Sequence, residues 1–169
     1  MEIVIRRGDS KDAERFIRLL NEVRAGMEHK EWFYLDPPEF VQEALEKETM
    51  KLWVAMDGDQ LAGAFDLLVP GLDDYNYGYD LDFSVEQLMK VVNMDSAAVY
   101  PAYRGQNLQQ RLLAEAEKEI SSWDERILLC TVHPENHYSL DNVLKQGYRI
   151  EKKLEKYDSV RYLLRKDIF

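Results

Sequence analysis

The stretch VYPAYRGQNLQQRLL, Val99–Leu113, places a tight turn between an apolar strand and a helix. The strand is expected to stop at Pro101, the turn to lie at Arg104-Gly105, and the helix to run from Leu108. A strand that turns sharply into a helix exposes backbone N–H groups and the positive end of the helix dipole, and phosphates bind at such places. The stretch therefore predicts a phosphate-binding turn, with an ordinary surface turn as the alternative.

Two residues of this turn differ from a glycine-rich phosphate loop, since Asn107 and Gln109 stand where glycines are expected. Asn is the non-glycine residue that best tolerates a left-handed backbone, so Asn107 can replace the first glycine at modest cost. Gln109 cannot permit the close backbone approach that glycine allows, although its long side chain could hydrogen-bond a phosphate oxygen.

The spacing of apolar residues predicts strands and helices along the rest of the chain. Asp57-Gly58 is a strong hairpin signal, Ser84 to Gln87 has the form of a capping box, and Gly147 suits a left-handed helix end. The order of elements predicts a mixed α/β sheet with helices crossing over between its later strands. The expected strands are residues 2–7, 51–56, 61–69, 92–100, 127–132, 148–156 and 160–167. The first expected helix is capped at Asp9 or Ser10 and ends near Gly26, and a second helix opens at residues 36–38 with its buried side within residues 40–45. Further helices are expected over about residues 84–91, 108–120 and 136–145.

Length and composition favour one compact domain over residues 1–169, because 169 residues with 46% hydrophobic content suffice for a sizeable core. A net charge of −10 disfavours nucleic acid or an anionic membrane surface as a general partner. The N-terminus lacks the apolar core of a signal peptide, and one cysteine is compatible with a reducing compartment. A soluble cytoplasmic protein is expected.

The charge is unevenly distributed along the chain. Residues 52–89 carry eight acids and no base, whereas residues 90–169 carry 13 bases and 12 acids. An anionic ligand is therefore expected on the last third of the chain and a cationic one near the middle.

Two motifs resemble those with which the GNAT N-acetyltransferase superfamily binds its cofactor. The first runs Arg/Gln-x-x-Gly-x-Gly/Ala in that family, and Arg104 to Gln109 matches it after the usual apolar-x-Pro at Val99 to Pro101. The second places an Asn eleven residues before a Gly-aromatic pair, as Asn136 and Gly147-Tyr148 do here. The resemblance covers almost the whole chain and implies a mixed, mostly antiparallel seven-stranded sheet with helices on both faces, splayed between the fourth and fifth strands.

The resemblance also implies a site for acetyl-CoA as cosubstrate, with no metal. The pantetheine arm would lie in the gap between the fourth and fifth strands, and an N–H there could hold the thioester oxygen as charge develops. Amides of the turn would take the pyrophosphate. The implied cofactor-binding residues are Ala97, Ala98, Val99, Arg104, Gly105, Gln106, Asn107, Leu108, Gln109 and Asn136.

Acyl transfer needs a neutral amine and a proton for the leaving thiolate. The family often uses a Tyr seven residues after the motif Asn as the acid, but Val143 occupies that position here. Tyr138 is the nearest replacement, with packing as its alternative role, and Asp95 could act as the base, directly or through water, with a solvent-facing strand acid as its alternative.

The acidic segment before the fourth strand mixes Asp with Tyr and Phe, a combination that could hold a cation on aromatic faces. Asp80, Asp82 and Tyr79 are the expected acceptor-binding residues, and a solvated loop is the alternative. Cys130, His133 and His137 are too few for a zinc site, and Cys130 in an apolar strand reads as a core residue.

The sequence thus favours an acetyl-CoA-dependent N-acetyltransferase that acts on a small-molecule or peptide amine by direct transfer in a ternary complex. The rival is a non-catalytic acyl-CoA-binding sensor or regulatory module, which Val143 would permit. The expected partner is the amine acceptor, with no nucleic acid and no membrane, and the protein is expected to be a monomer or a homodimer.

Overall fold

The computed structural model describes residues 2–169, which form a seven-stranded sheet in the order β1-β2-β3-β4-β5-β7-β6. The strands are β1 (Val4–Arg7), β2 (Met50–Asp57), β3 (Gln60–Leu68), β4 (Val91–Val99), β5 (Arg126–Val132), β6 (Arg149–Lys156) and β7 (Ser159–Ile168). The α-helices are α1 (Ala13–Ala25), α2 (Pro38–Glu46), α3 (Val85–Leu88), α4 (Leu108–Ile120) and α5 (His137–Lys145). The predicted fold class is confirmed, with β4 and β5 as the parallel pair.

Local signals account for where the elements begin and end. Asp9 caps a short 3-10 helix, Ser10–Asp12, through a reciprocal capping box with Asp12, and α1 follows directly. Gly58 has a φ of 58° in the turn between β2 and β3, and Ser84 makes the predicted capping box with Gln87. The helix expected over residues 84–91 is shorter, because α3 ends at Leu88 and Val91 already belongs to β4.

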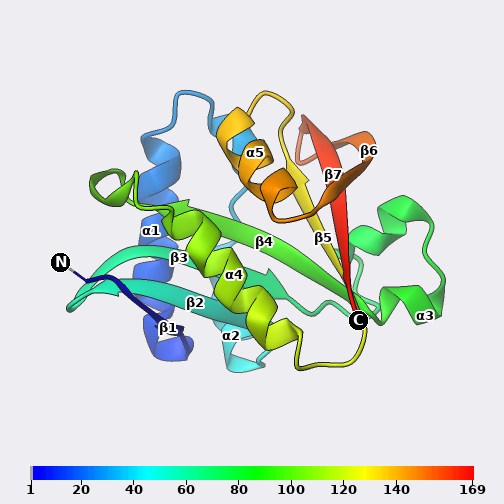
Figure 1. Cartoon of the computed structure of the whole chain (residues 1–169), viewed down its shortest axis with the longest axis horizontal. Coiled ribbons are helices and arrows are strands. Elements are labelled where there is room, and N and C mark those ends of the chain that lie inside the picture. Colours follow the sequence, from blue (N-terminus) through cyan, green and yellow to red (C-terminus); the bar gives the residue numbers. More distant parts are fainter. Residues whose placement is uncertain (1) are drawn as a thin grey trace. The chain divides into compact units, whose positions relative to one another are not determined.

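The chain divides into two compact units. The first comprises the chain up to Leu67 together with Ser96–Glu117, and the second comprises Leu68–Asp95 and Lys118–Phe169. The expectation that residues 1–169 form one domain stays a prediction. Within the first unit α1 lies behind the strands and α4 in front of them (Figure 1). α4 buries the predicted face, which consists of Leu108, Leu112, Leu113, Ala116 and Ile120.

The second unit is built on β5, β7 and β6. β7 lies in the middle and pairs antiparallel with both β5 and β6. Its core includes Tyr77, Val91, Ile127, Leu129 and Leu163. Within residues 2–169, no helix combines the length and the apolar character needed to cross a bilayer.

The parallel register between β4 and β5 covers Val91–Asn93 against Ile127–Leu129. β4 continues to Val99 and β5 to Val132, so the two strands part after three paired positions. The predicted splay between the fourth and fifth strands is confirmed.

Candidate functional site

The turn between β4 and α4 is the predicted phosphate-binding turn, and it contains two residues with positive φ. Gly105 and Asn107 both adopt left-handed conformations, with φ values of 85° and 56°. The prediction that Asn107 supplies this backbone geometry in place of glycine is therefore confirmed. The first helical hydrogen bond runs from the N–H of Arg111 to the carbonyl of Asn107, at 2.9 Å. The backbone N–H groups before Arg111 come ahead of this first helical hydrogen bond, at the end of the helix where anions can bind. Residues 104–107 are exposed.

Side chains around the turn differ in how they are held. Arg104 is exposed, whereas the guanidinium of Arg111 donates to the carbonyl of Ile3 at 3.2 Å. Leu108 is 2% exposed, so only its backbone can meet a ligand. Arg104 is therefore the better placed of the two cations for an anion at the turn.

The C-terminal half of β4 packs closely against β3. A Cβ on Gly63 would lie 2.9 Å from the carbonyl oxygen of Ala98, so only glycine fits at this point of β3. One residue before the predicted pantetheine contacts, the N–H of Ser96 donates to the buried carboxylate of Asp66 at 3.1 Å. Ala98 is buried, and Ala97 and Val99 are half-buried. The backbone that is expected to meet the cosubstrate is thus firmly positioned.

In the second unit, the predicted residues of α5 lie at its start. Asn136 is the N-cap, and its side-chain oxygen accepts from the N–H of Ser139 at 3.4 Å. Tyr138 is 63% exposed, so its hydroxyl is accessible from solvent. Val143 is buried, at 8% exposed, and its hydrocarbon side chain has no proton to donate to a leaving thiolate.

Asp95 lies next to a pair of phenols, one from the acidic segment before β4 and one from the turn between β6 and β7. The hydroxyl of Tyr77 donates to Asp95 Oδ1 at 3.4 Å and lies 3.1 Å from the hydroxyl of Tyr157. Tyr157 belongs to the turn between β6 and β7, and Arg161 on β7 is 3% exposed with its guanidinium 5.5 Å from the Tyr157 ring. Burial lowers the pKa of Arg161, and attraction to the ionised forms of Tyr77 and Tyr157 opposes that shift.

The expected acceptor-binding residues do not behave alike. Asp80 Oδ2 lies 2.8 Å from the ammonium of Lys156, so a cation from this chain already faces it. The hydroxyl of Tyr79 donates to the carbonyl of Leu72 at 2.7 Å, and Asp82 is exposed in a left-handed conformation. The structure therefore brings Asp80 to the phenol pair and leaves Asp82 facing solvent.

The family model described as Acetyltransferase (GNAT) family matches residues 16–148. The chain belongs to this family. Its members are acetyltransferases. Membership therefore favours an enzyme over the non-catalytic acyl-CoA-binding module. A comparison with curated proteins finds no match.

Solved structures similar to this acetyltransferase share its fold over nearly its whole length. A GNAT-family acetyltransferase from Streptococcus pneumoniae is 21% identical, with a TM-score of 0.76 and 99% of this chain and 100% of that chain covered. Arabidopsis thaliana NAA60 in complex with acetyl-CoA is 16% identical, with a TM-score of 0.78 and 99% of each chain covered. A ribosomal-protein-alanine N-acetyltransferase from Brucella melitensis is 18% identical, with a TM-score of 0.73 and 96% of this chain and 98% of that chain covered.

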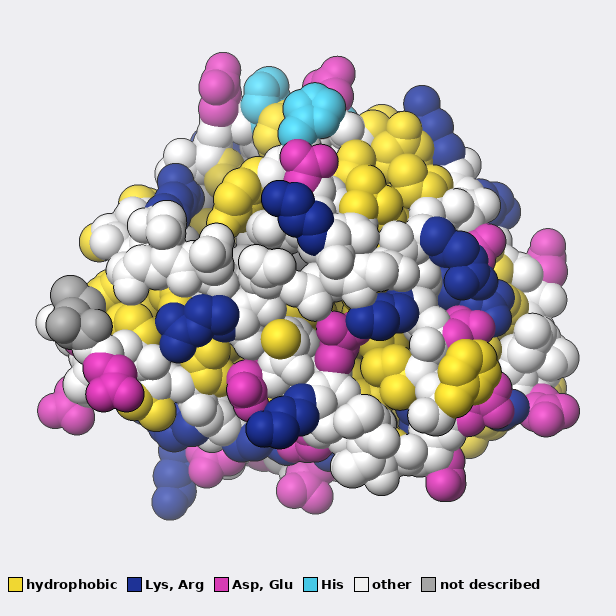
Figure 2. Space-filling view, viewed as in Figure 1, with side chains coloured by type: hydrophobic (Ala, Val, Ile, Leu, Met, Phe, Trp, Pro, Cys, Tyr) yellow, Lys and Arg dark blue, Asp and Glu magenta, His cyan; other side chains and the backbone are white. Residues whose placement is uncertain are grey.

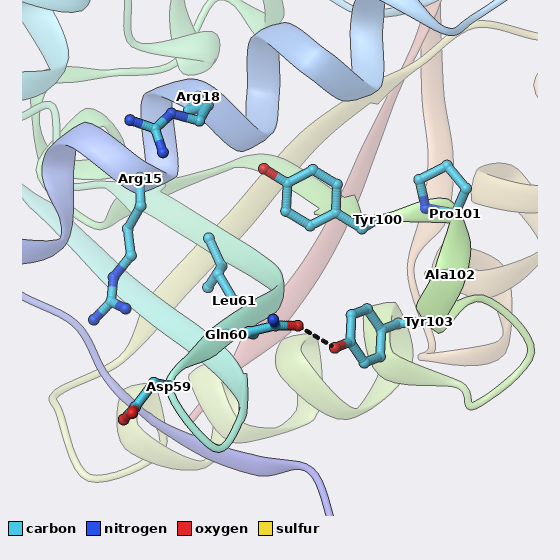
Figure 3. Close-up of a pocket in the computed structure, with 9 residues that line it drawn as sticks. All are labelled: Arg15, Arg18, Asp59, Gln60, Leu61, Tyr100, Pro101, Ala102 and Tyr103. Atoms are coloured by element: carbon cyan, nitrogen blue, oxygen red, sulfur yellow. Dashed lines mark hydrogen bonds between the residues drawn. The ribbon is translucent and has the colours of Figure 1, made fainter.

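The acetyltransferase also has a pocket of about 630 Å³ in its first unit, lined from α1, the start of β3 and the segment after β4. Figure 3 shows the Tyr100 hydroxyl directed toward Arg18, and Gln60 meeting Tyr103. Three polar groups of the lining already have partners in the chain: Arg15 binds Asp12, Arg18 binds Glu14, and the Tyr103 hydroxyl donates to Asp57. The hydrogen bond to Asp57 raises the pKa of Tyr103, and burial, followed by Glu22, raises that of Tyr100.

No group of three or more His, Cys, Asp or Glu within residues 2–169 is arranged to hold a metal ion. Cys130 is buried in β5, as expected of a core residue.

Sequence reasoning missed Tyr157 and Arg161, and it placed Tyr77 among the aromatic residues of the acidic segment and not beside Asp95. A local signal did exist for Arg161, since it lies two residues before Leu163 and therefore on the core-facing side of a strand, where a lone base is unusual. The pairing of the two tyrosines spans 80 residues and has no local signal.

Proposed function

We propose that this acetyltransferase moves an acetyl group from acetyl-CoA to an amine of a small molecule or peptide, by direct transfer in a ternary complex. The observation that carries the proposal is the pair of left-handed residues, Gly105 and Asn107, at the N-terminus of α4. The exposed backbone amides of this turn and the positive end of the α4 dipole can bind a pyrophosphate. The NAA60 structure, which has the same fold, is a complex with acetyl-CoA.

The cosubstrate supplies a thioester carbonyl for the amine to attack, and residues of the chain would bind, orient and move protons around it. Arg104 and the amides from Gly105 to Gln109 would bind the pyrophosphate, with Asn136 as a further contact. The backbone of Ala97, Ala98 and Val99 would position the pantetheine and the thioester oxygen.

Calorimetry with acetyl-CoA tests the cosubstrate site. Gly105→Val should weaken binding at least about tenfold, because a β-branched residue is strained at a φ of 85°. Gly71→Val is the matched control: Gly71 also has a positive φ, of 57°, and a Cβ at either glycine would meet nothing within 4 Å. Wild-type protein that binds no acetyl-CoA at millimolar concentration would contradict the proposal.

We assign the acid and base roles to Tyr138 and Asp95. Tyr138 would protonate the leaving thiolate, since Val143 is buried and has no proton to give. Tyr138→Phe and Asp95→Asn should each lower kcat by about 10²-fold or more while acetyl-CoA affinity stays unchanged. A thiol-release assay with a panel of amines measures this, with Tyr162→Phe, which replaces a half-buried phenol of β7, as the control. Wild-type kcat in both variants would remove them from the mechanism.

For the acceptor side we propose Asp82 and Tyr79, with Asp80 acting through Lys156, to which it is already bound. We further infer a cytoplasmic protein whose partner is the amine acceptor and which uses neither nucleic acid nor a membrane. The net charge of −10 supports this view, because phosphate-rich surfaces would repel the chain. Light scattering should give the mass of a monomer or a homodimer, and a larger assembly would contradict that inference.

A further inference from the structure

Three side-chain oxygen atoms of the second unit lie in a row. They belong to the half-buried carboxylate of Asp95, the buried phenol of Tyr77 and the half-buried phenol of Tyr157. Asp95 Oδ1 is 3.4 Å from the Tyr77 hydroxyl, which is 3.1 Å from the Tyr157 hydroxyl. Tyr77 is 3% exposed, whereas Asp95 and Tyr157 at the two ends are only partly covered. Protons can move along hydrogen-bonded oxygens of this kind, because a hydroxyl both donates and accepts.

The central phenol is held firmly in place. The backbone N–H of Tyr77 donates to Asn93 Oδ1 at 3.2 Å, and the Asn93 amide donates to the carbonyl of Tyr75 at 2.9 Å. Asn93 is 1% exposed and lies two residues before Asp95 on β4. β4 therefore positions both the carboxylate and, through Asn93, the ring that contacts it.

Two cations lie beside the phenols. The ammonium of Lys156 is 5.4 Å from the Tyr77 ring and 5.7 Å from the Tyr157 ring, and Asp80 holds it through the 2.8 Å ion pair. The buried guanidinium of Arg161 donates to the backbone carbonyl of Lys156 at 3.3 Å. Positive charge beside a phenol favours its ionised form and so helps the hydroxyl to give up its proton.

We propose that Asp95, Tyr77 and Tyr157 form a proton relay that carries the acceptor's ammonium proton to solvent. This inference rests on the proposed function, in which Asp95 is the base. An N–H bond of the ammonium breaks as Asp95 takes the proton. Once Asp95 is protonated, the Tyr77 O–H turns from Asp95 toward Tyr157, so that Asp95 can donate its proton to the Tyr77 oxygen. Tyr77 passes its own proton to Tyr157, and Tyr157 releases one to water. The neutral amine then forms the new C–N bond as the C–S bond of the thioester breaks.

Each oxygen of the relay gains one proton and loses one, so the chain returns to its starting state once the hydroxyls rotate back. Tyr77 and Tyr157 act through Asp95 and not on the substrate itself. They are therefore positioning residues for proton transfer, and their loss should affect kcat and leave the KM of either substrate close to the wild-type value.

A pH profile of kcat for Tyr157→Phe tests the relay. The variant should lose about tenfold or more in kcat at neutral pH, where an amine of pKa about 10.4 is protonated, and should approach wild type as the pH rises toward that value. An acceptor amine of lower pKa should show a smaller loss at neutral pH. A loss that is the same at every pH and for every amine would overturn the relay, because it would report a structural defect.

Tyr77→Phe removes the middle oxygen and should reproduce the Tyr157→Phe profile if the protein folds, which its acetyl-CoA affinity reports. Tyr162→Phe on β7 serves as the matched control and should follow the wild-type profile throughout. Wild-type kcat in Tyr157→Phe at neutral pH would also overturn the relay.

A second measurement does not depend on turnover. In protein labelled with ¹³C at the tyrosine Cζ, Asp95→Asn should lower the titration midpoints of Tyr77 and Tyr157, because a negative charge at the end of the series is removed. If wild type binds no acetyl-CoA or acetylates no amine, the proposed function fails and the relay fails with it, whereas this titration tests separately whether Asp95 is coupled to the two phenols, as the relay requires. Midpoints that are identical with and without the Asp95 charge would overturn it.

Discussion

Asn107 adopts a left-handed backbone at a cost that glycine would not incur. Asn107→Gly should therefore keep or improve acetyl-CoA affinity. Asn107→Val should weaken it by about 1–2 kcal/mol, because a β-branched residue resists a φ of 56°. Calorimetry measures both variants, with Glu48→Val as the control, because Glu48 is also an exposed residue with a left-handed backbone, at a φ of 60°. Equal affinity in the glycine and valine variants would show that the backbone at residue 107 does not shape the site.

Asp12 is a buried carboxylate held by two arginines. Burial alone would raise its pKa, but hydrogen bonds from Arg6 and Arg15 and from the N–H of Asp9 lower the pKa to about 2. Because the folded pKa lies below the unfolded one, Asp12 stabilises the fold above about pH 4, and this contribution disappears as the pH falls through about 2.

Asp12→Asn should thus lower the free energy of unfolding at pH 7. The expected loss is about 1–2 kcal/mol, since Arg6 and Arg15 side chains are 43% and 38% exposed and solvent screens them. Urea denaturation of both proteins from pH 7 to pH 2 measures the difference, which should narrow below about pH 4. Glu14→Gln, which breaks the exposed pair with Arg18, is the control and should have little effect. A difference in the free energy of unfolding between wild type and Asp12→Asn that stays constant down to pH 2 would contradict the lowered pKa of Asp12.

At the scale of the elements, β3 and β4 come so close at Gly63 that an added Cβ would meet the Ala98 carbonyl oxygen at 2.9 Å and a Val99 methyl at 3.1 Å. Gly63→Ala should destabilise the protein by about 1–3 kcal/mol and weaken acetyl-CoA binding, because the strand that carries the proposed pantetheine contacts must shift. Thermal unfolding and calorimetry measure the two effects. Gly26→Ala is the matched control, since its added Cβ would meet nothing closer than 3.7 Å. Unchanged acetyl-CoA affinity in a destabilised Gly63→Ala would separate this strand from the site.

Elements could be predicted from the sequence where their causes are local. Gly58 turns a hairpin, Ser84 caps a helix three residues from Gln87, and Gly147 follows α5 with a φ of 96°. Asn107 could be predicted for the same reason, because its backbone preference is its own. The surroundings of Asp95 could not, since the Asp80–Lys156 and Tyr77–Tyr157 contacts span 76 and 80 residues. Such pairs form only when the sheet brings β6 and β7 to the segment before β4.

For the molecule as a whole, the net charge of −10 should act on charged acceptors over distances longer than any contact. Dark blue and magenta side chains are interspersed on the face that Figure 2 shows, so that face carries no single acidic patch. The segment 52–89, with eight acids and no base, contributes most of the excess. A cationic acceptor should therefore be drawn to the enzyme at low salt.

Two peptides with the same N-terminal residue, one rich in lysine and one rich in glutamate, provide the test. Adding salt to about 1 M shortens the Debye length to about 3 Å, which should lower kcat/KM for the lysine-rich peptide and raise it for the glutamate-rich one. Opposite slopes would show that the overall charge selects the acceptor. Equal salt dependences of kcat/KM for the two peptides would mean that groups near the site outweigh the net charge. Lys156, which already neutralises Asp80, is one such group. In that case acceptor choice would depend on the local residues beside β6 and β7 and not on the field of the whole chain.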